Sequence, residues 1–402
     1  MIAWLILATS AIAGERENLT GPASGCWSGR PPSAEWDRFR SDLRDRGIAL
    51  EFIYRGELFK SAGLDPSNGT DYRGLLDLAL TFHTEKMGLW PGGELFLRMQ
   101  NGHGRGFNVT PAGVVLPISN IDAQDFTQVG EYGIKQSFVN SRLRLNLGKQ
   151  DVNKVFCQNE FGSHLVNPSF ALIPTVPMPT FPAPALGATL VAEPAKWLSL
   201  GGGFYDGGPK VGTLGFETAL EGKGGYFSIF ETGGRPGFGI NERYPGNYRI
   251  GLWYHSGEFA GTDPGQNSGK LSGNYGFYLL ANQAVYRRKT TVTADEGLGV
   301  FLQFGWAPSD RNQVTRYLGA GFAYKGFLIC RPHDILGFGV GHTDLVGSLP
   351  PGQKAKLTSA ELFYDIQLNR WMSLRPDIQY FDNPGGDRKH GWAAGVRGII
   401  RL

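Results

Sequence analysis

Trp392-Ala-Ala-Gly-Val-Arg-Gly-Ile-Ile-Arg-Leu402 is the stretch of sequence that decides the fold class of this chain. Side chains in a strand alternate between two faces. One face of this stretch carries Arg397 and Arg401, and the other carries Trp392, Ala394, Val396, Gly398, Ile400 and Leu402. In a transmembrane β-barrel the outward face meets lipid and the inward face meets a polar lumen. The final stretch therefore predicts a barrel strand, provided that the rest of the chain repeats the pattern.

The same alternation recurs along the chain. One phase is apolar and the other mostly polar in the segments 48–55, 76–83, 94–100, 142–147, 248–255 and 361–368. Tyrosines stand near the ends of the apolar phase, as they do in the aromatic girdles at membrane interfaces. A water-soluble antiparallel sandwich would also alternate, and the apolar N-terminus described below favours the barrel. About 16 strands would share the chain with roughly 22 residues each, enough for a spanning strand of about 10 residues and its connection.

Composition agrees with a chain of many short strands and turns. It has 59 Gly and 24 Pro among 402 residues, with 19% charged and 12% aromatic residues. The formal net charge of +3 is small, and basic residues do not cluster among aromatics. These features argue against a nucleic-acid partner.

The N-terminal part divides into two segments ahead of a barrel at 47–402. Residues 1–13 form an apolar stretch ending in Ala-Ile-Ala, which predicts a signal peptide without the usual basic n-region, although an uncleaved anchor stays open. Residues 14–46 are expected to lie in the periplasm. Within them, 33–47 has a serine at a plausible N-cap, apolar residues at helical spacing and a final glycine, which predicts a short amphipathic helix.

A proline-rich stretch at 168–184 interrupts the strand pattern. Its five prolines after Pro168 cannot donate to a β-ladder, so it must be a long loop. Such a loop either folds inward and narrows the lumen or faces solvent, and the sequence leaves both placements open.

Signals for catalysis, metal binding or a cofactor are missing. The seven histidines have no metalloprotease spacing, and no Gly-x-Ser-x-Gly elbow occurs. Cys26, Cys157 and Cys330 have no metal spacing, and whether Cys157 pairs with Cys330 stays open. Gly337-Phe-Gly-Val-Gly341 repeats glycine at period two, which indicates a closely packed strand face instead of a phosphate loop. Arg331-Pro-His-Asp334 is interpreted as structural. We therefore expect neither an enzyme nor a cofactor.

From about Leu43 onward the chain closely resembles the OprB family of carbohydrate-selective porins. The resemblance rests on the order and spacing of segments 47–57, 147–151, 167–170, 248–257, 299–308, 324–334 and 375–386. It implies a sixteen-stranded antiparallel barrel in the outer membrane of a Gram-negative bacterium, through which mono- or oligosaccharides diffuse passively. Implied partners are sugars, outer-membrane lipid and the barrel-assembly machinery. The family favours a monomer, whereas general porins of this size are usually trimers. One departure is Leu402, where such barrels commonly end in an aromatic residue.

Charged and aromatic side chains on the inner phase are the candidates for contact with sugar, because arginines and carboxylates replace water at hydroxyl groups and rings pack on the CH faces. Arg98 and Trp253 are the preferred pair. The full set of pore-lining candidates is Glu51, Arg55, Asp77, His83, Glu94, Arg98, Arg142, Arg144, Arg249, Trp253, Asp365, Asp377, Arg397 and Arg401. The same residues would also serve to brace the wall by pairing across strands.

Other functions stay open at this stage. The inner-phase arginines also suit a general or anion-leaning diffusion porin. Less favoured alternatives are an outer-membrane enzyme such as a barrel lipase, and a structural barrel occluded by its proline-rich loop.

Overall fold

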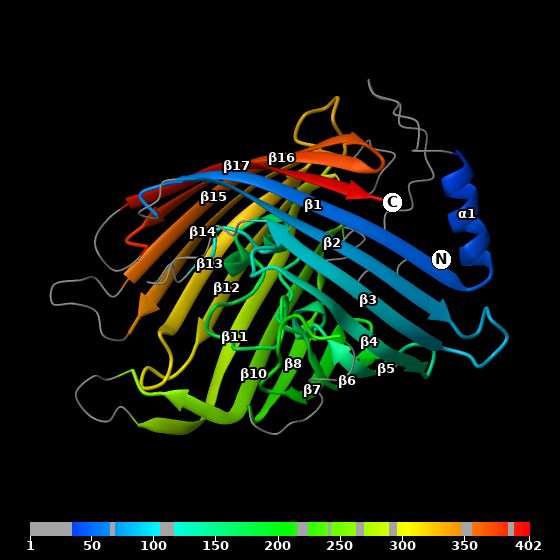
Figure 1. The fold of residues 1–402 in the computed structure, drawn as a ribbon, viewed down its shortest axis with the longest axis horizontal. Helices are drawn as coiled ribbons and strands as arrows, with labels where there is room; N and C mark the ends of the chain where they lie inside the picture. The colour runs from blue at the N-terminus through cyan, green and yellow to red at the C-terminus, as the bar shows by residue number, and fades with distance from the viewer. Residues whose placement is uncertain are drawn as a thin grey trace.

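The computed structural model is a single β-barrel with one short helix at its N-terminal side (Figure 1). It describes residues 34–64, 69–104, 116–214, 224–239, 243–262, 269–288, 296–346, 356–384 and 390–402. The expected signal peptide at 1–13, the segment at 14–33 and Cys26 lie outside these residues. Within them, no helix is long and apolar enough to cross a bilayer.

The expected helix is α1, Ala34–Asp45. Trp36 and Phe39 lie on one side of it, with ring centroids 5.7 Å apart. Gly47 follows with φ +87°, a left-handed conformation that suits glycine and lets the chain turn directly into the first strand.

Sixteen strands of the described chain form the barrel, and a two-residue piece, β9 (Gly237–Phe238), pairs with the start of β10. The strands are β1 (Ile48–Ala62), β2 (Thr70–His83), β3 (Gly93–Gly104), β4 (Phe126–Phe138), β5 (Leu143–Gln150), β6 (Ala185–Ala195), β7 (Leu198–Asp206), β8 (Tyr226–Gly234), β10 (Tyr244–Ala260), β11 (Lys270–Arg287), β12 (Gly297–Trp306), β13 (Val314–Lys325), β14 (Ile335–Leu345), β15 (Lys356–Asn369), β16 (Met372–Asp382) and β17 (His390–Arg401).

The barrel closes where the last strand meets the first. Each strand pairs antiparallel with its neighbour in sequence, β8 pairs with β10, and β1 pairs with both β2 and β17. Leu402 extends this seam, because its backbone N–H and C=O both bond to Phe52, at 2.8 and 3.1 Å. The chain end therefore joins the ladder although it lacks an aromatic side chain. The expected sixteen-stranded antiparallel barrel is confirmed.

The two ends of the barrel differ. Helix α1, the C-terminus and tight turns such as 139–142 and 196–197 lie at one end, and the longest connections, such as 151–184, lie at the other (Figure 1). In outer-membrane barrels the short turns are periplasmic and the long loops extracellular. The outward phase is apolar and exposed, as at Leu252, Leu302 and Trp392.

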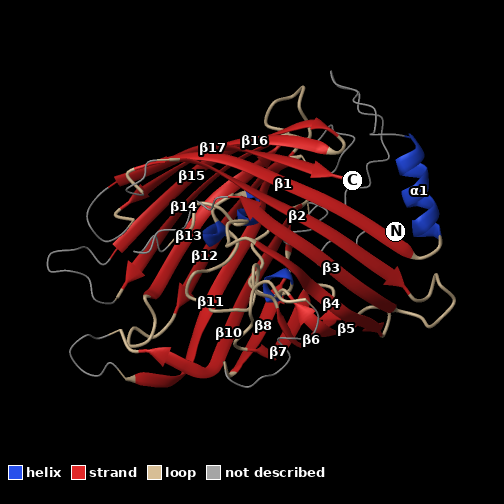
Figure 2. Ribbon diagram, in the orientation of Figure 1, coloured by secondary structure: helices blue, strands red, loops and turns tan. Residues whose placement is uncertain are grey.

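Two segments enter the barrel from its extracellular end. Residues 151–184 carry three 3-10 helices, η1 (Val152–Lys154), η2 (Gly162–His164) and η3 (Pro168–Phe170), which lie within the ring of strands (Figure 2). We call 151–184 the inward segment. Residues 116–125 form a second, shorter one, which bonds to the first where the Asn120 N–H donates to the Val166 carbonyl at 2.9 Å.

The inward segment packs on glycines of the barrel wall. Gly339 and Gly341 on β14 lie opposite Gly321 and Gly319 of β13, and Gly337 lies opposite Ala323, which confirms the interpretation of this stretch as a close-packed strand face. A Cβ atom added at Gly339 would lie 2.7 Å from Leu165 and 2.9 Å from Phe170. Glycine is required here because the inward segment occupies the space that a side chain would fill.

Candidate functional site

A network of charged side chains lines the inner face of β1–β4. Its centre is Arg98 on β3, whose guanidinium lies 3.0 Å from Glu131, 3.4 Å from Asp77 and 3.6 Å from Glu51. Arg55 on β1 adds a second bond to Asp77 at 2.7 Å. Four strands thus bring together residues that are far apart in sequence.

This network runs from the wall into the open lumen. The side chain of Asp77 is 2% exposed, that of Arg98 is 12% exposed and that of Glu51 is 44% exposed. Because an arginine held by carboxylates keeps its orientation, Arg98 presents a fixed donor at the edge of the water-filled space. Donors and acceptors therefore stand side by side there.

Lys154 reaches the same network from the opposite side. It lies in η1 of the inward segment and forms an ion pair with Glu131. The inward segment thus contributes its own cation beside Arg98, and the surface here combines strand and loop residues.

A second group lies on β15–β17 and the seam with β1. Arg375 bonds Asp365 at 2.5 Å, lies over the Phe363 ring and donates to the His164 carbonyl of η2. Arg397 pairs with Glu57 across the seam. Asp377 accepts a bond from Gln379 at 3.0 Å. These groups are buried, so they hold the inward segment and the seam in place instead of facing the lumen.

The remaining candidates lie apart from both groups. His83 and Glu94 are 3.4 Å apart at the periplasmic ends of β2 and β3, and Arg144 pairs with Glu193 at 3.0 Å. Arg401 is half-buried near the end of β17, beside the same periplasmic rim. Arg142 is exposed in the turn before β5, so it does not stand on the inner face of a strand.

Trp253 points inward from β10, as expected, but it is 3% exposed. It packs in an apolar cluster with Ile173, Val176 and Phe227, beneath the inward segment. An aromatic ring covered on all sides offers no surface to a solute. The preference for Trp253 as a sugar contact is therefore not supported by its position.

Sequence reasoning missed three residues of these networks. Glu131 was missed because the ladder between β3 and β4 slips at Arg98 and Met99, so that the period-two pattern breaks in β4. Glu231 on β8, which pairs with Arg249 at 3.1 Å, stands in a strand of nine residues with few charges. Lys154 lies outside any strand, where strand alternation carries no information.

The cysteines and histidines assemble no reactive centre in the described chain. Cys157 is buried in the inward segment, Cys330 is exposed near the periplasmic rim, and both thiols are free. Burial raises the pKa of the Cys157 thiol to about 12, which keeps it protonated and unreactive at neutral pH. No group of three His, Cys, Asp or Glu side chains in the described residues could hold a metal ion. Arg331 and Asp334 bond each other at 2.7 Å and brace the turn after β13.

A closed barrel with an apolar outer surface and water-facing charges of both signs inside it is a diffusion channel of the outer membrane, a porin. The profile of the OprB family, described as carbohydrate-selective porins, matches residues 67–401 of the chain. The chain belongs to this family. It is thus a carbohydrate-selective porin of the Gram-negative outer membrane, a channel and not an enzyme.

Individual relatives are distant but cover nearly the whole chain. Porin B of Pseudomonas aeruginosa is 23% identical over 403 residues, with 88% of this chain and 86% of that protein aligned. The putative porin QuiX of Acinetobacter baylyi is 21% identical, with 90% and 91% aligned. The high-pH structure of Pseudomonas putida OprB has a TM-score of 0.82 at 21% identity, covering 94% of this chain and 99% of that one. The low-pH structure of the same protein has a TM-score of 0.61 at 17% identity.

Proposed function

We propose that neutral mono- or oligosaccharides diffuse passively through this barrel and that they contact Arg98, Glu51 and Lys154 on the way. The single observation that carries the proposal is the partly exposed network around Arg98, where cations and carboxylates alternate within ion-pair distance. A sugar that sheds water needs both donors and acceptors, and this surface offers both.

The other inner-phase candidates take supporting roles in this proposal. Arg55 and Asp77 orient Arg98 from behind, since both are buried and bonded to each other. His83, Glu94 and Arg144 are partly exposed closer to the periplasmic rim and are proposed as secondary contacts. Arg249, Asp365, Asp377 and Arg397 are proposed to brace the wall and the inward segment.

Liposome swelling tests the transport itself. Vesicles with the purified porin should swell in isotonic solutions of a monosaccharide and, more slowly, of a disaccharide, because the larger solute diffuses less readily through a narrow lumen. The proposal would be refuted if none of the sugars tested made the vesicles swell although the same porin conducts salt in planar bilayers. Porin-free vesicles and the same porin heated before reconstitution are the controls.

A general or anion-leaning porin is the alternative, and the cluster of Arg98, Arg55 and Lys154 is the observation that favours it. Reversal potentials in a potassium chloride gradient separate the two. A mixed-sign lumen predicts weak ion selectivity, whereas a strongly anion-selective pore would support the alternative.

We further propose that the barrel works as a monomer inserted by the barrel-assembly machinery. The family resemblance favours the first part, and the pore needs no second copy, because β1 and β17 close the lumen within one chain. Light scattering of the detergent-solubilised protein should give the mass of one chain. A mass of three chains would overturn the proposal that the barrel works as a monomer.

A further inference from the structure

The inward segment is held to the barrel wall by side chains that bond to its backbone. Glu361 on β15 accepts the N–H groups of Val166 and Asn167, at 2.5 and 2.8 Å. Gln303 on β12 donates to the Ser169 carbonyl at 2.6 Å. The part of the segment around η2 and η3 is therefore fastened by several strands.

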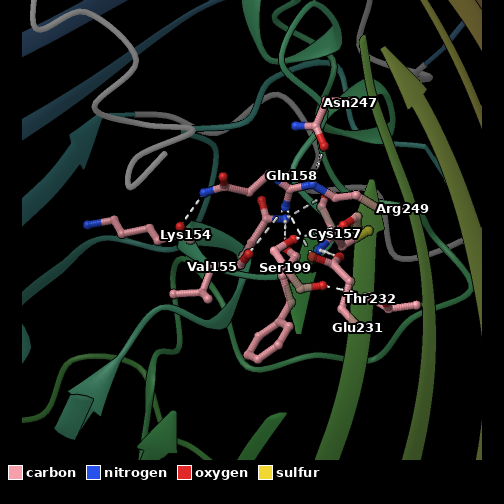
Figure 3. A network of polar contacts seen from close by, with 12 residues as sticks. Lys154, Val155, Cys157, Gln158, Ser199, Glu231, Thr232, Asn247 and Arg249 are labelled. Carbon is pink, nitrogen blue, oxygen red and sulfur yellow. Dashed lines mark hydrogen bonds and ion pairs between the residues drawn. The ribbon is translucent and has the colours of Figure 1, made fainter. Parts of the chain in front are cut away.

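The part that follows η1 has a different attachment. The Cys157 N–H donates to Oε2 of Glu231 at 2.9 Å, and Arg249 on β10 reaches the Val155 carbonyl at 3.5 Å (Figure 3). These contacts come from two adjacent strands on one side of the barrel. Glu231 and Arg249 thus hold residues 155–157, and the next residues are held by other strands, because Asn159 donates to Gln303 on β12 at 3.0 Å and the Phe161 N–H donates to Asn282 on β11 at 3.2 Å.

Glu231 is itself fixed by its neighbours. Tyr278 on β11 donates its hydroxyl to Oε2 at 2.6 Å, and Arg249 donates to Oε1 at 3.1 Å. The residue is 8% exposed. A buried carboxylate with donors on both oxygens has a defined orientation, so it is a rigid support for the Cys157 amide.

The backbone at Cys157 depends on this support. Cys157 has φ +57°, in the left-handed region that residues other than glycine, asparagine and aspartate rarely occupy. Such conformations persist where surrounding contacts impose them. Its thiol side chain is fully buried and belongs to the apolar cluster that also contains Phe156, Trp253 and Tyr278.

The bond to Glu231 is also coupled to the charged surface of the lumen. Lys154, three residues before Cys157, pairs with Glu131 beside Arg98. A shift of residues 155–158 would carry Lys154 with it, and would change both the width of the lumen and the charges next to Arg98.

We propose that Glu231 is a positioning residue for transport, which fixes the η1 end of the inward segment through the Cys157 amide and so sets the aperture of the pore. The residue acts through the segment and does not touch the sugar. The inference deepens the proposed sugar pathway, because the loop that it holds presents Lys154 to that pathway.

The native thiol of Cys157 reports on this attachment directly. In a background with Cys26→Ser and Cys330→Ser, the folded porin is treated with a water-soluble maleimide and the rate of Cys157 labelling is measured. Glu231→Gln should raise this rate roughly ten- to hundredfold, because a bond to a charged group that closes the segment is lost. Glu231→Asp should give a smaller increase, and single-channel conductance should rise in the same order.

Two further variants keep the test decisive. Glu193→Gln removes another inward carboxylate, whose side-chain bonds among the described residues go to Arg144 and Arg235 on the barrel wall, so labelling should stay at the parent rate. Tyr278→Phe keeps the Glu231 carboxylate but removes one bond that orients it, and should raise labelling a few-fold even if Glu231→Gln fails to assemble.

The proposal would be overturned if the labelling rate of Cys157 stayed at the parent value in a folded Glu231→Gln or Tyr278→Phe variant. Faster labelling without any change in conductance would overturn its second half, the control of the aperture. Because the thiol readout involves no sugar, its result is independent of whether the pore prefers sugars.

Discussion

The two sides of the lumen are built differently. The inner face of β12–β15 carries glycines and apolar residues such as Phe301 and Phe363, and it is covered by the inward segment. The inner face of β1–β4, from its middle to its periplasmic end, carries Glu51 and Arg98, which stay partly exposed beside the buried Glu131. We call these the covered wall and the open wall.

The difference shows what an inward side chain in a barrel indicates. Small and apolar inward residues mark a wall on which another part of the chain packs, because such a contact excludes water. Charged inward residues that remain partly exposed mark the wall that faces the solute. Arg98 and Trp253 both point inward, but only Arg98 belongs to an open surface.

The largest effect is expected on the covered wall, from Gly339→Leu. The side chain would overlap Leu165 and Phe170, and such overpacking costs about 1–3 kcal/mol or displaces the neighbour. We expect the inward segment to leave its position and conductance in planar bilayers to rise several-fold. Gly202→Leu is the matched control, because a Cβ at Gly202 meets nothing within 4 Å. Unchanged conductance in a folded Gly339→Leu barrel would contradict the claim that the inward segment covers this wall.

A smaller effect is expected on the open wall, from Arg98→Ala. Removing this donor should weaken sugar-dependent block of the single-channel current, with a half-saturating concentration about threefold to tenfold higher, as for one lost hydrogen bond of ordinary net strength to a hydrated sugar hydroxyl. Arg38→Ala, which removes the same charge from an exposed position on α1, serves as the control. If both variants bind sugar like the parent, Arg98 has no part in the pathway.

The smallest effect on transport is expected from Trp253→Phe. A buried tryptophan contributes packing, so the variant should lose about 1–3 kcal/mol of stability in heat-denaturation measurements. The half-saturating sugar concentration should stay within about twofold of the parent value. A large loss of sugar block without loss of stability would restore Trp253 as a contact.

The fold was predictable because strand alternation is a local property of the sequence. The stretch from Trp392 to Leu402 pairs with β1 and β16 in the phase that its arginines indicate. The site was predictable only in part. Whether Trp253 or Arg98 meets water depends on where residues 151–184 pack, and that placement is determined by contacts such as Glu361 with Val166, which are distant in sequence. Glu131 and Lys154 were missed for a different reason, because a bulge and a loop carry no periodic signal.

Substituted cysteines test the distinction between the two walls most directly. In a background with the three native cysteines replaced by serine, Glu51→Cys places a thiol on the open wall and Ser359→Cys places one on the buried inner face of β15. A small charged thiosulfonate added during single-channel recording should reduce the current through the Glu51→Cys pore within seconds to minutes and leave the Ser359→Cys pore unchanged. Equal reaction at both positions, or reaction at Ser359→Cys alone, would contradict the account.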